Sequence, residues 1–97
     1  MSELDKILLK LKRQKAILRR KFKIKSLGVF GSYSRGEQRK TSDVDVLVEF
    51  DEPPGLIGYV SLEDELGKYI GKKVDLVMKS ALKPHVGQQI LREVIYI

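Results

Sequence analysis

One segment of this chain alternates apolar and polar residues so regularly that it limits what the whole chain can fold into. Over residues 43–50, one set of alternate positions is apolar and consists of Val44, Val46, Val48 and Phe50. The other set consists of Asp43, Asp45, Leu47 and Glu49. Because successive side chains of a β-strand point to opposite faces, this pattern predicts a strand with one face against a core. The rest of the chain must supply the elements that cover that face.

The remaining apolar residues predict how that cover is built. Apolar side chains at helical spacing predict three helices, and short apolar runs predict two further strands. The helices are expected over residues 2–22, 56–70 and 86–95, the strands over residues 27–30 and 73–78, and a short helical turn followed by a loop over residues 33–40. This alternation predicts an α/β (α+β) fold in which helices flank a small mixed β-sheet. A chain of 97 residues is expected to form one domain, over residues 1–97.

Composition restricts the cellular setting and the class of partner. The chain has no cysteine, its first residues lack the apolar run of a signal peptide, and no stretch is long and apolar enough to span a membrane. We therefore expect a cytoplasmic protein with no membrane partner. The net charge of +6 is concentrated in residues 1–25, which hold ten Lys or Arg against two acids. Such a basic helix suits an acidic protein surface, nucleic acid or simply water.

Three aspartates are the candidate metal ligands. Asp43 and Asp45 are two residues apart on the alternating strand, so their carboxylates share a face. Asp75 lies within a second apolar run and is expected on the same non-core side of a neighbouring strand. Magnesium prefers a few carboxylates together with water and phosphate oxygens, and two ions can clamp the attacking and leaving oxygens of a displacement. These residues predict a magnesium site, with Asp75 also the candidate proton acceptor.

A glycine turn lies just upstream of these acids. Gly31 and Ser32 follow an apolar strand and precede an expected helix start, where free backbone N–H groups can bind an anion. Glycine lets the backbone approach a phosphate closely, the Ser32 hydroxyl can donate a hydrogen bond, and Arg35 can add positive charge to the same triphosphate. Taken singly, each feature is more often an ordinary turn or a solvated edge. Their combination favours a nucleoside triphosphate site.

Residues 31–50 resemble the signature of the DNA polymerase β-like nucleotidyltransferases, and more narrowly that of the minimal nucleotidyltransferase (MNT) family, in the sequence GSYSRGEQRKTSDVDVLVEF. The family's third-carboxylate strand and C-terminal segment resemble KKVDLV and LKPHVGQQILREVIYI. The resemblance implies the polymerase β-like fold, ATP as substrate and two bound Mg²⁺ ions. It implies that the nucleotide is contacted by Gly31, Ser32, Arg35 and Ser42, and that metal binding and catalysis depend on Asp43, Asp45 and Asp75.

The resemblance also implies a reaction and a partner. A hydroxyl attacks the α-phosphorus of ATP, and pyrophosphate leaves. MNT proteins are similar to the antitoxin of a two-protein toxin–antitoxin system whose toxin is a HEPN ribonuclease. What this likeness implies is AMPylation of a tyrosine on that toxin. Because 97 residues leave no room for an acceptor-binding domain, a second copy or a different protein is expected to complete the cleft.

A binding module is the competing interpretation. The basic helix within residues 1–25 could neutralise an acidic toxin or contact nucleic acid without any chemistry. Transfer of a nucleotide to a small molecule such as an aminoglycoside is disfavoured by the missing acceptor-binding domain. Two further residues are interpreted structurally: Tyr33 is expected at the surface, and His85 in the loop at a helix start.

Overall fold

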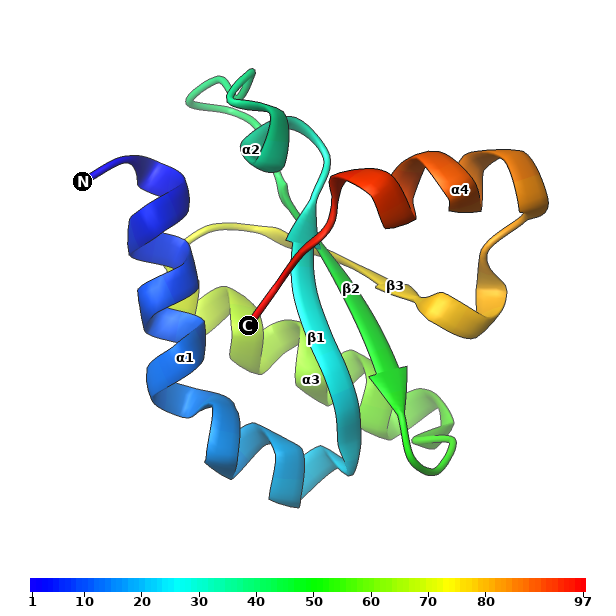
Figure 1. Cartoon of the computed structure of the whole chain (residues 1–97). Helices are drawn as coiled ribbons and strands as arrows, with labels where there is room; N and C mark the ends of the chain where they lie inside the picture. The colour runs from blue at the N-terminus through cyan, green and yellow to red at the C-terminus, as the bar shows by residue number, and fades with distance from the viewer.

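The computed structural model describes residues 1–97 and consists of a four-stranded mixed β-sheet with helices packed against it (Figure 1). In chain order the elements are α1 (Glu3–Phe22), β1 (Ile24–Phe30), α2 (Ser32–Arg35), β2 (Val44–Phe50), α3 (Gly55–Ile70), β3 (Val74–Met78), the short 3-10 helix η1 (Lys79–Ala81), α4 (Pro84–Glu93) and β4 (Ile95–Tyr96). The strand order is β3-β2-β1-β4, in which only β2 and β3 are parallel. The expected fold class is confirmed. None of the helices combines the length and the apolar character that crossing a membrane requires.

The main core lies between the sheet and helices α1 and α3. The valines of β2 point into it and are completely buried, as the alternation predicted. The residues that meet them from the two helices are Ile7, Leu11 and Leu18 of α1 and Leu62, Leu66 and Ile70 of α3. Each such side chain stabilises the fold by about 1.5–3 kcal/mol relative to an exposed one. This packing anchors β2, the strand that carries two of the candidate aspartates.

The ends of α1 follow from its sequence. The Ser2 hydroxyl accepts a hydrogen bond from the Asp5 N–H at 3.0 Å, and the Asp5 carboxylate accepts one from the Ser2 N–H at 3.2 Å. This capping box starts the helix. At the other end Lys23 is left-handed, with a φ of 55°, and turns the chain sharply into β1. The strand therefore begins at Ile24, earlier than expected, and Ile24 pairs with Phe50 of β2.

The C-terminal segment differs from the helix expected over residues 86–95. Helix α4 ends at Glu93, and the next residues form the edge strand β4, which is antiparallel to β1. Gly28 of β1 permits this close approach, because a Cβ added there would lie 2.6 Å from Cγ2 of Val94. Pairing with the free edge of β1 thus overrides the helical spacing of Val94.

The expectation that Tyr33 lies at the surface is wrong. Its side chain is only 1% exposed and belongs to the main core cluster. The reason is that α2 is a single helical turn that folds back against β1, β2 and α1. His85 lies in the first turn of α4, not in a loop, and is exposed.

Side chains of α3 close the outer edge of β3. The backbone N–H of Leu76 donates to the Glu63 carboxylate at 3.0 Å, and the carbonyl of Leu76 accepts the Tyr59 hydroxyl. Burial raises the pKa of Tyr59, so this hydroxyl keeps its proton and remains a donor. An open edge strand can pair with another chain. Glu63 and Tyr59 remove that possibility in the middle of β3.

We predict that Glu63→Ala lowers the free energy of unfolding by about 1–3 kcal/mol, because it leaves the part-buried N–H of Leu76 without a partner. Asp64→Ala is the matched control, since Asp64 is the next residue on α3 and makes only an exposed ion pair with Lys68. Urea unfolding followed by circular dichroism measures both. Equal stabilities of the two variants would contradict the role given to Glu63.

Candidate active site

The sheet register brings two of the aspartates together. Asp45 of β2 and Asp75 of β3 are direct partners in the parallel ladder, so both side chains leave the same face of the sheet. That face is opposite α1 and α3, because the valines on either side of Asp45 point into the main core. Asp43 immediately precedes β2. Strands far apart in the sequence thus place their carboxylates side by side.

The carboxylates influence one another electrostatically. Burial raises the pKa of Asp45, and the negative charges of Asp75, Asp43 and Glu93 raise it further. The guanidinium of Arg35 acts in the opposite direction and lowers it. The ionised form of Asp45 is therefore held among like charges. Such an arrangement favours the binding of positive charge.

The donor set suits a magnesium ion that protein and substrate hold jointly. No group of three or more His, Cys, Asp or Glu side chains converges to form a complete metal site. The Asp43 carboxylate lies 3.9 Å from the ammonium of Lys73, and Asp75 is exposed. Magnesium commonly takes one or two carboxylates and completes its shell with water and substrate phosphates. Neighbouring carboxylates that repel one another fit this mode of binding, and they do not form a closed protein cage.

The glycine turn lies directly against Asp45. Gly31 has a φ of 76°, and a Cβ added to it would lie 2.1 Å from Oδ2 of Asp45. Only glycine therefore combines this backbone conformation with this contact. Its carbonyl accepts the N–H of Arg35 at 3.1 Å and the hydroxyl of Ser34 at 2.9 Å. The turn is thereby held in place beside the carboxylates.

The two candidate serines lie at opposite ends of the segment that joins β1 to β2. Ser32 is the first residue of α2 and is partly exposed. The hydroxyl of Ser42 accepts the N–H of Arg39 at 2.8 Å, and the Ser42 N–H donates to the Arg39 carbonyl at 3.0 Å. Ser42 therefore closes the loop that leads into Asp43, which is a structural task that the sequence did not reveal.

Arg35 is engaged by two acids, one of which sequence reasoning missed. Its Nε donates to Glu37 at 2.7 Å, and its Nη1 donates to Glu93 at 3.0 Å. Glu93 is the last residue of α4, and its side chain is only 16% exposed. Glu93 belongs to no motif that relates its position in the sequence to the aspartates or to the glycine turn. The sequence showed only that the C-terminal segment contains an acid, and gave no sign that this acid pairs with Arg35.

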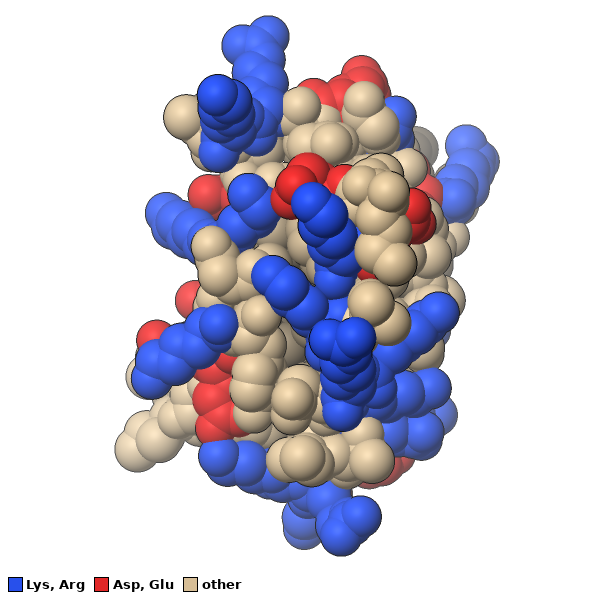
Figure 2. All heavy atoms as spheres, turned by 90° about the vertical axis from the view of Figure 1, so that its left-hand side faces the viewer, with Lys and Arg blue, Asp and Glu red and all other residues tan.

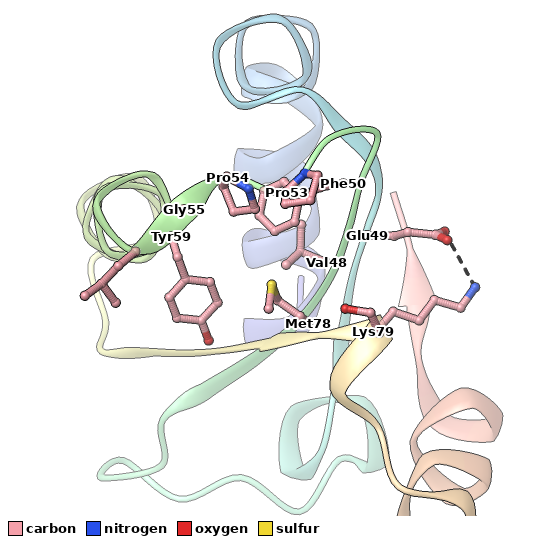
Figure 3. Close-up of a pocket in the computed structure, with 11 residues that line it drawn as sticks. Val48, Glu49, Phe50, Pro53, Pro54, Gly55, Tyr59, Met78 and Lys79 are labelled. Carbon is pink, nitrogen blue, oxygen red and sulfur yellow. Dashed lines mark ion pairs between the residues drawn. The ribbon is translucent and has the colours of Figure 1, made fainter.

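A hollow of about 670 Å³ lies away from the aspartates (Figure 3). It lies at the other ends of β2 and β3, where Phe50, Tyr59 and Met78 contribute to a mainly apolar lining. Its one acid, Glu49, is 3.7 Å from the ammonium of Lys79. This hollow therefore has neither the paired carboxylates nor the glycine turn, both of which lie at the opposite ends of these strands.

The geometry agrees with known proteins. A family model described as a nucleotidyltransferase domain matches residues 11–97. The chain belongs to this nucleotidyltransferase family. Protein adenylyltransferase MntA of Thermococcus cleftensis is 45% identical over 97 residues, which cover 100% of this chain and 95% of that protein.

Solved structures extend the likeness to the fold. A minimal nucleotidyltransferase matches with a TM-score of 0.75 and 35% identity, over 92% of this chain and 93% of the other. A toxin–antitoxin complex solved with AMP-PNP matches with a TM-score of 0.71 and 26% identity, over 88% of this chain and 70% of the other. The resemblance to minimal nucleotidyltransferases that the signature indicated is confirmed.

In this nucleotidyltransferase, we predict that Gly31→Ala displaces Asp45 and weakens ATP binding by about tenfold. Gly36→Ala is the matched control, because Gly36 has a similar φ of 71° but nothing lies within 4 Å of an added Cβ. Both variants carry the strain of a positive φ, which is larger at Gly31 because its ψ of −149° lies outside the left-handed region, and only Gly31→Ala also carries the collision. Calorimetric titration with ATP and thermal unfolding separate the two effects. An equal loss of affinity in both variants would refute the importance of the contact.

We predict that Asp45→Asn raises the melting temperature of the nucleotidyltransferase at pH 7. The pKa of Asp45 is raised from its ordinary value of 3.8, so between these values the folded state binds more protons than the unfolded state. Stability therefore falls as the pH rises from the ordinary value through the raised one. The gain in the variant should shrink below about pH 4, where Asp45 is protonated in both states. Scanning calorimetry across this range measures it, and a gain independent of pH would contradict the prediction.

Proposed function

We propose that this nucleotidyltransferase moves AMP from ATP onto a hydroxyl of a partner protein, as one minimal domain over residues 1–97. The observation that carries the proposal is the contact of the Gly31 turn with Asp45, with Asp75 in register on the next strand. This arrangement supports a turn that binds phosphate beside paired carboxylates. The 45% identity to a protein adenylyltransferase supports transfer to a protein, and the likeness to a complex solved with AMP-PNP supports an adenine nucleotide as substrate.

Each part of the site has a proposed role. The turn at Gly31 and Ser32 binds the triphosphate, Arg35 adds positive charge, and Ser42 holds the loop that orders Asp43. The three acids Asp43, Asp45 and Asp75 would hold magnesium, as two ions. When bound, magnesium supplies positive charge to the phosphates and eases proton loss from the acceptor hydroxyl.

The reaction is an in-line displacement. The acceptor hydroxyl oxygen forms a bond to the α-phosphorus of ATP, the bond to the bridging oxygen breaks, and pyrophosphate leaves with that electron pair. Asp75 accepts the hydroxyl proton, since it is the exposed member of the carboxylate pair and the one an incoming group can reach. The remainder of catalysis is positioning by the turn and the strands.

The proposed acceptor is a tyrosine of a HEPN-type toxin, which this chain would silence as its antitoxin in the cytoplasm. Two observations support a protein partner. The relative from Thermococcus cleftensis is a protein adenylyltransferase, and a matching solved chain belongs to a toxin–antitoxin complex. The exposed Asp75 also leaves the site open on the side from which a large acceptor must come.

A second candidate function is binding without chemistry, through the basic face of α1. Figure 2 shows the side of the molecule on which α1 lies, and Lys and Arg side chains dominate it. Lys15 and Arg19 of α1 and Lys25 of β1 line one small hollow of about 120 Å³ with Tyr96, and none of the three forms an ion pair. Cations beside an aromatic ring suit a nucleic-acid strand, and cations alone suit an acidic protein.

We predict that the purified toxin partner gains mass in whole AMP units when it is incubated with this chain, ATP and MgCl₂. The variant Asp43→Asn/Asp45→Asn should abolish the gain. Asp51→Asn/Glu52→Gln is the matched control, because these acids follow the same strand but are exposed and distant from the turn. Intact mass spectrometry reads the gain, and fragmentation identifies the acceptor residue.

The same experiment separates the two candidate functions. Full transfer by the Asp43→Asn/Asp45→Asn variant would refute the assigned roles of these acids. No transfer by the wild type, together with a complex that forms without ATP and weakens steeply with salt, would support the binding module instead.

A further inference from the structure

The guanidinium of Arg35 is held from two sides and is free on the third. Nε donates to Glu37 at 2.7 Å and Nη1 to Glu93 at 3.0 Å, while Nη2 donates to no protein atom. A guanidinium carries five N–H donors in a fixed planar fork. Because the guanidinium is planar, the carboxylates that bind Nε and Nη1 also fix the direction in which the N–H groups of Nη2 point. Arg35 is also close enough to Asp45 to lower its pKa.

The two acids that hold Arg35 differ in what they attach it to. Glu37 lies two residues beyond Arg35, just after α2, and its side chain is 64% exposed. Glu93 comes from the end of α4, and its side chain is 16% exposed. Gly87 is the only buried residue of α4, so this helix has little apolar anchorage of its own. The pair between Arg35 and Glu93 therefore links the end of α4 to the end of α2, the short helix that begins at the glycine turn.

We propose that Glu93 is a positioning residue that orients the free edge of Arg35 toward the nucleotide triphosphate. This inference rests on the proposed function, because it assumes that a nucleotide binds at the Gly31 turn. Glu93 acts through Arg35 and touches neither substrate nor metal. It also makes α4 part of the nucleotide site, although α4 itself carries none of the predicted ligands.

The sign of the effect distinguishes this role from simple electrostatics. Glu93 is a negative charge near the site, so its direct influence on a triphosphate is repulsive. Removing its charge would strengthen nucleotide binding if Glu93 did nothing else. If Glu93 holds Arg35 in place, removing it leaves the guanidinium, at the end of the four-residue helix α2, with only the exposed Glu37 as a partner. Binding then weakens, because ordering Arg35 must occur when the nucleotide binds.

The test is a double-mutant cycle read by calorimetric titration with AMP-PNP in MgCl₂, which reports binding without turnover. We expect Glu93→Gln to weaken binding about fivefold to tenfold in the wild-type background. In the Arg35→Ala background the same substitution should leave binding unchanged or strengthen it. Glu93→Asp keeps the charge but is one methylene too short for the 3.0 Å contact, so it should also weaken binding. Glu52→Gln, which removes an exposed pair with Lys23 far from the site, should have no effect.

Several outcomes overturn the inference. Unchanged or tighter binding by Glu93→Gln in the wild-type background would mean that Glu93 does not position Arg35. Equal weakening in both backgrounds would mean that Glu93 supports the fold in general, and a Glu93→Gln variant that unfolds leaves Glu93→Asp to decide the question. If the wild-type chain binds no AMP-PNP, the proposed function fails together with the inference. If it binds normally and Glu93 variants match it, only the inference fails.

Discussion

Strand β2 is paired on both sides, and its register determines where the candidate catalytic groups lie. Antiparallel pairing sets Asp45 opposite Phe30 of β1, so the Gly31 turn that follows Phe30 lies against the Asp45 carboxylate. Parallel pairing sets Asp75 beside Asp45. A slip of one residue would turn the carboxylates into the core and the valines out to solvent. The apolar burial that stabilises the sheet therefore also positions the site.

The site concentrates negative charge that the fold does not neutralise by itself. Burial and the neighbouring carboxylates raise the pKa of Asp45, which means that its ionised form lowers the stability of the folded chain near neutral pH. Arg35 offsets part of this charge and is itself held by Glu93. Repulsion among these carboxylates is relieved when a cation binds. A phosphate group can then bind beside the cation, because the two charges compensate each other.

The fold protects the sheet while it leaves the carboxylate face accessible. Glu63 and Tyr59 of α3 satisfy the outer backbone groups of β3 at Leu76, and the C-terminal strand β4 pairs with the opposite edge of the sheet. Helix α4, in contrast, buries only Gly87 and reaches the site through Glu93.

Local pattern alone determined the strand at β2, the helices α1 and α3, the glycine turn and the face of the sheet on which Asp45 lies. These features depend on residues that are close together in the sequence. Alternation, helical spacing and the conformational freedom of Gly31 can each be recognised within a few residues. Only the tertiary structure decided that Tyr33 is buried, that the segment after Glu93 leaves its helix to pair with β1, and that Glu93 holds Arg35. Each of these results from a contact between segments far apart in the chain. The local residue pattern of a single sequence does not indicate which distant segment packs against a given residue.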